Sequence, residues 1–366
     1  MDYKEDPRYL QTQIITYIGN KRSLLPFIGK GVETVKTRLG KTRLASLDLF
    51  SGSGIVARYL KRHSDLLIAN DLEQYSKICN QCYLANFSSV DMNELADTAD
   101  FLRKKINANL APGFITEMYA PQDETRIAET DRCFYTRANA IFLDSARREI
   151  AKLPERLQIF FLAPLLVRAS VHANTSGVFK GFYKNARGIG QFGGSGRDAL
   201  ARITGSIDID IPIFSRFKCE AIVLQSDANE IVSEIPEVDL AYLDPPYNQH
   251  PYGSNYFMLN LLAGYERPIE TSRVSGIPTN WNRSRYNQRA SAADALFAAV
   301  DSCPAKFIII SYNSEGFITR EAFIDGLKKR GKTTILETPY NTFRGSRNLR
   351  ARKTHVTEFL YLLEKS

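Results

Sequence analysis

Cysteine, histidine and tryptophan are scarce in this sequence of 366 residues, which contains five, four and one of them respectively. Five cysteines are an odd number, and they are too few for a disulfide framework in a chain of this length. Cys79 and Cys82 form a single C-x-x-C pair, and no second pair follows at the spacing of a zinc site. Since the histidines are scattered as well, the sequence predicts no metal site, and the two cysteines are interpreted as buried helix residues.

Long apolar runs are also missing. Residues 1–10 are polar and charged and lack the apolar core of a signal peptide, and no run approaches the roughly 18 residues that a membrane span needs. The hydrophobic content of 44% and the aromatic content of 11% are nevertheless typical of a globular protein with a core. We therefore expect a cytoplasmic protein without a membrane partner.

Acidic residues are outnumbered by basic ones, 40 against 48, which gives a formal net charge of +8. This excess favours a polyanionic partner, although many basic proteins bind nothing acidic. Between Arg168 and Arg202 six basic residues are opposed by one acid, Asp198, and between Asn341 and Lys353 five basic residues are opposed by none. These two stretches are the predicted phosphate contacts.

Seven apolar segments bounded by turn residues predict β-strands. They span residues 44–50, 66–69, 219–224, 238–243, 307–311, 333–337 and 356–364. Helical patterns lie between most of them, so the predicted fold class is α/β, with a seven-stranded, mostly parallel sheet that is covered on both faces. The last two strands can pair as an antiparallel hairpin at one edge.

A long segment between the second and third strands differs in kind. Helical patterns recur there at 94–110, 133–151 and 155–172, and a glycine- and arginine-rich stretch follows. Because strand signals are scarce, we expect an inserted, mostly helical domain at residues 87–212. Residues 1–86 and 213–366 would together form the domain that contains the sheet.

A glycine turn follows the first strand, at the edge where open α/β sheets bind ligands. The end of the strand and the turn read Asp48, Leu49, Phe50, Ser51, Gly52, Ser53 and Gly54. Glycine in this turn lets the backbone approach a ligand closely. Asp71 follows the second strand, about 20 residues on, where an acid can accept hydrogen bonds from ribose hydroxyls. These features alone fit NAD, FAD and S-adenosylmethionine equally well.

The segment Asp244-Pro245-Pro246-Tyr247 follows another apolar strand and so lies at the same edge of the predicted sheet. The exocyclic amino group of a purine is a poor nucleophile, because its lone pair is delocalised into the ring. The carboxylate of Asp244 and the carbonyl of Pro245 can accept its two hydrogens and localise that lone pair for attack on a sulfonium methyl group. Tyr247 offers a face on which a flipped-out base can stack. A rigid proline turn without a function is the alternative.

With its motifs in this order, the sequence resembles the Dam-type, alpha-group N6-adenine DNA methyltransferases. Residues 17–22 (YIGNKR) are similar to the family's N-terminal cofactor segment, and the glycine turn, two acids and the DPPY tetrapeptide follow in the family's order. The resemblance implies a Rossmann-like S-adenosylmethionine-dependent methyltransferase fold. The cofactor residues that it implies are Tyr17, Asn20, Lys21, Asp48, Phe50, Ser51, Gly52, Ser53, Gly54, Asp71, Asp227 and Asp244. The catalytic residues that it implies are Asp244, Pro245, Pro246 and Tyr247.

In that family an insert between the second and third sheet strands is the target-recognition domain, so the resemblance assigns residues 87–212 to DNA binding. Residues 174–180 (NTSGVFK) resemble the family's N-x-x-G-x-F-N hairpin, with Lys180 in place of the last asparagine. The predicted DNA contacts are Lys180, Lys184, Asn185, Arg187, Arg197, Arg344 and Arg347.

The resemblance implies a bacterial or phage-encoded enzyme that methylates adenine at particular sites in double-stranded DNA. Such an enzyme acts alone or within a restriction-modification system, where a cognate endonuclease would act separately. Two alternatives stay open. An RNA adenine methyltransferase would use a related site, and a non-catalytic DNA-binding protein could retain the cofactor fold.

The segment 326–333 (GLKKRGKT) matches the pattern of a P-loop. A P-loop must follow a strand and open a helix. Here a predicted helix precedes the segment and a predicted strand follows it. We therefore expect no ATP site at this position.

Overall fold

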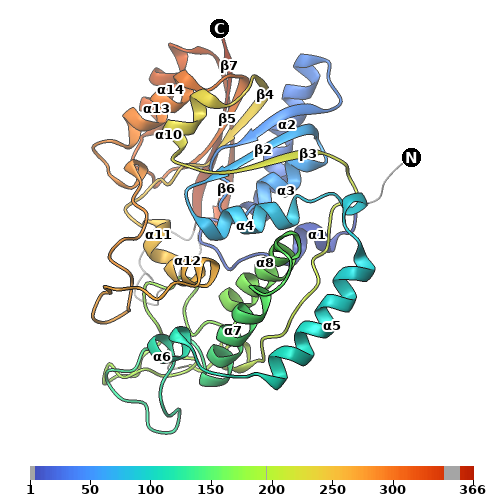
Figure 1. Cartoon of the computed structure of the whole chain (residues 1–366). Helices are drawn as coiled ribbons and strands as arrows, with labels where there is room; N and C mark the ends of the chain where they lie inside the picture. Colours follow the sequence, from blue (N-terminus) through green and yellow to red (C-terminus); the bar gives the residue numbers. More distant parts are fainter. Residues whose placement is uncertain (1–4, 195, 342–354) are drawn as a thin grey trace.

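A sheet of seven strands forms the centre of the upper half of the molecule in Figure 1. The computed structural model describes residues 5–194, 196–341 and 355–366. The strands are β1 (Leu44–Asp48), β2 (Ser64–Asp71), β3 (Glu220–Gln225), β4 (Val238–Leu243), β5 (Ala305–Asn313), β6 (Gly331–Asn341) and β7 (His355–Lys365). Their spatial order is β3-β2-β1-β4-β5-β7-β6, with β1 to β5 parallel and β7 antiparallel to both neighbours. The predicted sheet and its edge hairpin are confirmed.

Helices cover both faces of this sheet, because successive strand residues point alternately to the two sides. On β5, Ile308 and Ile310 lie in one apolar core, and Ile309 lies in the other. The first core includes α10 (Ala228–Ile231), α13 (Ala292–Ser302) and α14 (Arg320–Lys328). The second includes α2 (Leu25–Leu39) and α3 (Ile55–Lys61), which lie on the opposite face in Figure 1.

The long segment between β2 and β3 is helical, as predicted. Its helices are α5 (Met92–Ala108), α6 (Phe114–Tyr119), α7 (Arg137–Ile150), α8 (Glu155–Val171) and α9 (Leu200–Thr204). In the described part of residues 87–212, the only strand-like pairing is an isolated bridge between Lys184 and Gly190. The predicted helix at 133–151 begins later than expected, because the side chain of Thr136 accepts a hydrogen bond from the amide of Asn139 and caps α7.

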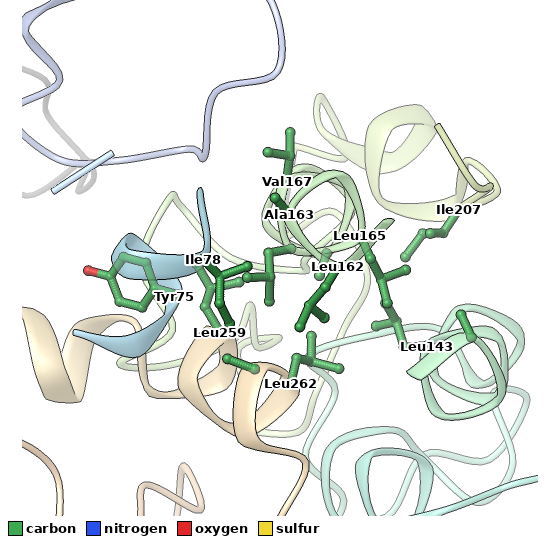
Figure 2. Packing of buried hydrophobic residues seen from close by; sticks show 14 of the residues in the cluster. Tyr75, Ile78, Leu143, Leu162, Ala163, Leu165, Val167, Ile207, Leu259 and Leu262 are labelled. Carbon is green, nitrogen blue, oxygen red and sulfur yellow. The ribbon is translucent and has the colours of Figure 1, made fainter. Parts of the chain in front are cut away.

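The inserted helices share one core with two helices from the sheet portion, α4 (Gln74–Tyr83) and α12 (Phe257–Gly264). Figure 2 shows Ile78 of α4 and Leu259 and Leu262 of α12 beside Leu162 and Ala163 of α8. Ten of the 17 residues of α8 are buried, so this helix lies in the interior of the core. The core is thus continuous across the predicted boundaries of residues 87–212. The division into a catalytic and a target-recognition domain stays a prediction.

Short helices complete the described chain. They are α1 (Arg8–Gln11), α11 (Tyr252–Asn255), η1 (Lys21–Leu24), η2 (Phe87–Ser89), η3 (Val232–Glu234) and η4 (Arg285–Asn287), where η marks a 3-10 helix. The segment that matches a P-loop runs from α14 into β6, so a helix precedes it and a strand follows, as predicted. Within the described ranges, no helix combines the length and apolar character that crossing a membrane requires.

Candidate functional site

One pocket lies at the carboxyl ends of β1 to β4. The strand order reverses between β1 and β4, and ligands of open α/β sheets bind outside the strand ends at such a point. The predicted site residues that line the pocket are Tyr17, Asn20, Lys21, Asp48, Phe50, Ser51, Gly52, Ser53, Asp71, Asp227, Asp244 and Pro246. The others at this sheet edge, Gly54, Pro245 and Tyr247, are not among the lining residues.

The glycine turn passes close to the ring of Tyr17. Gly52 has a φ of +52°, and a Cβ added there would lie 3.1 Å from the ring and the hydroxyl of Tyr17. The amide of Gly52 donates a hydrogen bond of 2.7 Å to Oδ2 of Asp71. A side chain at this position would therefore be strained and would push against a wall of the pocket.

Two acidic residues at the end of β2 line the pocket. Asp71 Oδ1 accepts the amide of Glu73 at 2.9 Å, and Glu73 in turn accepts side-chain hydrogen bonds from Asn260 at 2.5 Å and from Asn282 at 3.1 Å. Burial raises the pKa of Asp71 to about 6. Burial, with Asp71 nearby, raises the pKa of Glu73 to about 7. The sequence interpretation missed Glu73, although its place two residues after Asp71 was a usable signal.

Asp48 is a buried acid at the end of β1 without a hydrogen-bonding partner. Its side chain is fully buried, and neither carboxylate oxygen accepts a hydrogen bond of normal geometry from the described residues, although the nearby amides of Ala57 and Phe50 act to lower its pKa. Burial, reinforced by Asp244 and Asp71, raises the pKa of Asp48 well above its usual range. A buried acid of this kind is suited to a ligand that brings a cation or a hydrogen-bond donor.

Stacked tyrosines form another wall of the pocket. The ring of Tyr17 stacks against Tyr252 and Tyr256, with ring centroids 5.0 and 4.6 Å away. The hydroxyl of Tyr256 accepts the amide of Ile18 at 2.7 Å, which ties this segment to α11 and α12. Tyr17 therefore packs against two neighbouring rings and has little freedom to move. Tyr252 also lines the pocket, and the sequence interpretation missed it.

The end of β3 contributes a carboxylate beside two aromatic rings. Asp227 caps α10 by accepting the amide of Asn229 at 2.8 Å. The rings of Phe50 and Tyr286 meet edge to face at 5.0 Å, and the hydroxyl of Tyr286 donates to Oδ1 of Asn229 at 2.9 Å. An aromatic pair next to a carboxylate can hold a purine ring together with its amino group.

Asp244 directly follows β4 and forms an ion pair with Lys21, with 3.1 Å between Oδ1 and Nζ. Burial raises the pKa of Asp244 to about 6, Lys21 opposes this rise, and Glu358 of β7 adds to it. Burial disfavours the Lys21 ammonium, yet Asp244 and Glu358 raise the pKa of Lys21 well above its usual value. The pocket therefore contains a carboxylate that is ionised at neutral pH and a lysine that is protonated.

The tetrapeptide is anchored at its last residue, Tyr247. The carbonyl of Tyr247 accepts the amide of Phe317 at 3.0 Å, and its ring meets Tyr312 edge to face at 6.0 Å. The carbonyl of Pro245 accepts no hydrogen bond from the described residues. This loop is thus held rigidly while one of its backbone acceptors stays available.

The predicted DNA contacts of the insert differ in what their side chains do. Lys180, Lys184, Arg187 and Arg197 are exposed. Asn185 is half-buried, and its side chain accepts the amides at 187 and 189, so it already stabilises its own turn. The remaining two predicted contacts, Arg344 and Arg347, lie outside the described residues.

A second basic segment, residues 271–289, lies against this part of the insert. The hydroxyl of Ser275 donates to the carbonyl of Lys180 at 2.7 Å. Arg273, Arg283 and Arg289 are exposed, and none of the three pairs with a carboxylate among the described residues. The sequence interpretation missed this segment, because its basic residues are spaced too widely to form a charge run.

The cysteines are buried and free, including Cys79 and Cys82 in α4. Burial raises the pKa of both thiols. They are therefore helix residues of the core, as predicted, and are poor candidates for redox chemistry. Among the described residues, no group of three or more His, Cys, Asp or Glu side chains could hold a metal ion.

Known proteins resemble this chain over nearly its whole length. The Type II methyltransferase M.NlaIII of Neisseria lactamica is 27% identical over 362 residues, which cover 96% of this chain and 100% of that protein. The Type II methyltransferase M.CviAII of Paramecium bursaria Chlorella virus 1 is 28% identical over 355 residues, 95% of this chain and 98% of that protein. Modification methylase StsI of Streptococcus sanguinis is 27% identical over 95% of this chain but only 52% of its own length.

A family model described as D12 class N6 adenine-specific DNA methyltransferase matches residues 17–323. The match begins at Tyr17 in the pocket wall and includes the glycine turn, Asp71, Asp227 and Asp244. It thus spans every strand end that forms the pocket. The chain belongs to the D12 class N6 adenine-specific DNA methyltransferase family.

Proposed function

We propose that the chain binds S-adenosylmethionine in the pocket at the ends of β1 to β4 and methylates N6 of an adenine that has been flipped out of duplex DNA. The observation that carries this proposal is the position of Asp244. It lines the cofactor pocket, pairs with Lys21, and is followed by a proline carbonyl that accepts no hydrogen bond from the part of the chain that the structure describes. Acceptors for an amino group therefore lie next to the proposed methyl donor.

The pocket residues fit this cofactor, which supplies an activated methyl group when it is bound. Asp71 is suited to the ribose hydroxyls, since each of its oxygens accepts one backbone amide and keeps a lone pair. Phe50, Tyr286 and Asp227 are suited to the adenine ring. Asp48, whose buried oxygens accept no hydrogen bond from residues within the described ranges, is suited to the ammonium group of the methionine part.

The proposed acceptor site is formed by the tetrapeptide. Asp244 and the carbonyl of Pro245 would each accept one hydrogen bond from the adenine amino group, and these two bonds would localise the lone pair on the nitrogen. Tyr247 would stack on the base, and its ring is fixed by Tyr312. Since transfer is direct, no covalent bond between the enzyme and the base is needed.

Product analysis tests this function. The protein is incubated with duplex DNA and methyl-labelled S-adenosylmethionine, and the nucleosides are then separated. We expect the label in N6-methyladenine. Label in N4-methylcytosine would contradict the base assignment, preferential labelling of structured RNA would support an RNA methyltransferase, and tight DNA binding without any label would support a non-catalytic protein.

Gly52→Ala tests where the cofactor binds. The added Cβ meets Tyr17, which is itself held by Tyr252 and Tyr256, so the pocket wall must move by a few tenths of an ångström. We expect the Kd for S-adenosylmethionine, measured by calorimetry, to rise about tenfold or more, which corresponds to roughly 1.4 kcal/mol.

Gly40→Ala is the matched control for this substitution. Gly40 also has a positive φ, of +65°, but a Cβ added there would have nothing within 4 Å. Both variants therefore lose similar backbone stability, about 1 kcal/mol. An equal cofactor affinity of the two variants would show that the turn at Gly52 does not face the cofactor.

We further propose that duplex DNA lies across residues 180–187 of the insert and the 271–289 segment. Ser275 joins these two segments through its hydrogen bond to Lys180. Asn282, Ser284 and Tyr286 of the second segment also line the pocket, so DNA bound there would lie over the pocket opening. The exposed arginines and lysines of both segments are suited to phosphate contacts. In this proposal residues 87–212 serve as the target-recognition domain.

Lys184→Ala and Arg187→Ala are each expected to weaken duplex DNA binding severalfold without changing its sequence preference, because a phosphate contact has no base specificity. Fluorescence anisotropy at several salt concentrations should show the slope of log K against log salt reduced by about one per residue. Lys152→Ala is the control, since Lys152 is exposed but pairs with Glu149. Unchanged affinity and slope in both test variants would argue against this DNA path.

The relatives suggest a biological setting. M.NlaIII and M.CviAII are named type II methyltransferases. We propose that this chain, too, modifies the recognition sequence of a separate restriction endonuclease. Single-molecule sequencing of DNA from a methylation-free host that expresses the chain would identify the modified sequence.

A further inference from the structure

Lys21 lies between the buried carboxylate of Glu358 and the partly buried carboxylate of Asp244, the first residue of the tetrapeptide. Lys21 Nζ lies 3.3 Å from Oε1 of Glu358, in addition to its contact with Asp244. The side chains of Lys21 and Glu358 are only 6% and 2% exposed. The hydroxyl of Ser311 donates a hydrogen bond of 2.8 Å to the same oxygen of Glu358. Lys21 is therefore shared between two acids, of which only Asp244 lines the pocket.

The sheet fixes the second acid in place. Glu358 lies on β7, a strand with neighbours on both sides, and its register partner on β5 is Asn313. Ser311 lies two residues before Asn313, on the same face of β5, so its hydroxyl reaches Glu358 diagonally across the strands. Glu358 is thus held by backbone pairing and by a side-chain hydrogen bond, and it provides a rigid anchor for Lys21.

We propose that Glu358 is a positioning residue for methyl transfer, which holds the Lys21 ammonium against Oδ1 of Asp244 and leaves Oδ2 for the adenine amino group. This inference rests on the proposed function of Asp244. Glu358 does not line the cofactor pocket and touches neither substrate in this proposal. Its effect on the reaction passes through Lys21.

Charge balance gives Glu358 a second effect. One lysine and two carboxylates carry a net charge of −1, so Glu358 offsets part of the attraction between Lys21 and Asp244. Without Glu358 the ammonium would act on Asp244 alone and make it a weaker hydrogen-bond acceptor. Burial raises the pKa of Asp244, Lys21 lowers it and Glu358 raises it, with a net value of about 6.

Other ionisable groups also face this cluster. Asp48 of β1 interacts with Asp244 from the neighbouring strand. The hydroxyls of Tyr242, Tyr247 and Tyr252 approach from β4, the tetrapeptide and α11, and burial raises the pKa of each. These hydroxyls stay protonated at neutral pH. Asp244 is therefore the tetrapeptide group expected to titrate near pH 6.

Glu358→Gln tests the inference through the pH dependence of kcat. With both substrates saturating, kcat of the unaltered protein should fall as the pH decreases through about 6, where Asp244 takes up a proton. In Glu358→Gln we expect kcat at pH 7.5 to fall about tenfold, while the KM values change less than threefold. The acid limb of the pH profile, where kcat falls as the pH decreases, should move to lower pH. Asp71 and Glu73 also titrate near this range but face the cofactor, so they act on its KM.

Glu364→Gln is the matched control. Glu364 lies on the same strand and also pairs with a basic residue, Arg38, but at the partly exposed surface. This variant should keep the kcat and the acid limb of the unaltered protein. A lower kcat in Glu358→Gln with an unmoved acid limb would reduce Glu358 to a structural role, and an unchanged kcat would overturn the inference.

A double variant keeps the inference testable if Glu358→Gln folds poorly. Lys21→Met combined with Glu358→Gln removes both the cation and the anchoring acid, and the two have opposite effects on Asp244. If Glu358 acts through Lys21, Glu358→Gln causes no further loss of kcat in the Lys21→Met background. Independent, additive losses would contradict the inference. Failure of the unaltered protein to methylate adenine would instead contradict the proposed function.

Discussion

Asp244→Asn is expected to lower kcat for adenine methylation about a thousandfold, because it replaces a charged acceptor with an amide whose NH2 group cannot accept a hydrogen. Lys21 would then lose one of its two ion pairs at the reacting centre. The other pocket acids remain, so the Kd for S-adenosylmethionine should change less than tenfold. Single-turnover methylation of a short duplex and calorimetry measure the two quantities separately.

Asp239→Asn provides the control for this prediction. Asp239 lies near the other end of β4 and pairs with Lys41 at the surface. Its substitution should leave kcat within about twofold, because it is far from the reacting groups. Residual activity above a few per cent in Asp244→Asn would show that another group accepts the hydrogens of the amino group.

Lys21→Met is expected to lower the free energy of unfolding by about 3–5 kcal/mol at pH 8, because it leaves the buried carboxylate of Glu358 and the partly buried carboxylate of Asp244 without their cation. The loss should shrink as the pH falls. Burial already raises the pKa of Asp244 to about 6, and removing the lysine that opposes this rise increases it further. The folded state then binds more protons than the unfolded state, so protonation stabilises it as the pH decreases from 8 to 5.

Urea unfolding at pH 8 and pH 5 measures this difference. Lys41→Met is the control, since Lys41 is half exposed and its pair with Asp239 should contribute less than about 1 kcal/mol. A loss in Lys21→Met that is equal at both pH values would show that unpaired carboxylates are not its cause. The same variant should have little methylation activity, because Asp244 loses the group that positions it.

The sheet and the tetrapeptide could be predicted from sequence because both depend on local patterns. Apolar runs bounded by turn residues marked all seven strands. Asp48 and Asp71 end β1 and β2, Asp227 and Asp244 follow β3 and β4, and parallel strands bring such ends to one edge. This expectation about strand ends can be applied without knowing which distant residues are in contact.

The predictions that fell short concern side chains whose role depends on a partner. Asn185 was assigned to DNA because it lies in the insert; its side chain accepts two backbone amides of its own turn, and its contact with DNA stays a prediction. The start of the helix at 133–151 was placed too early. A hydrophobic pattern contains no information about the capping hydrogen bond that the side chain of Thr136 accepts. Ser275 had no pattern to mark it, since its importance comes from its bond to Lys180.

The role of Glu358 could not be predicted from the sequence pattern. In the run VTEFLYLLE it reads as an ordinary strand residue. Only the insertion of β7 between β5 and β6 places it beside Lys21, which comes from the other end of the chain.

The chemistry of the tetrapeptide and the succession of strands along the chain are local properties, so the family and the cofactor edge of the sheet follow from the order of residues alone. Which acids share a lysine, and which segment lies beside Lys180, depends on strand register and loop packing. Hydrogen bonds and ion pairs act over only a few ångströms, and groups far apart in the chain come within that range only after the fold has formed.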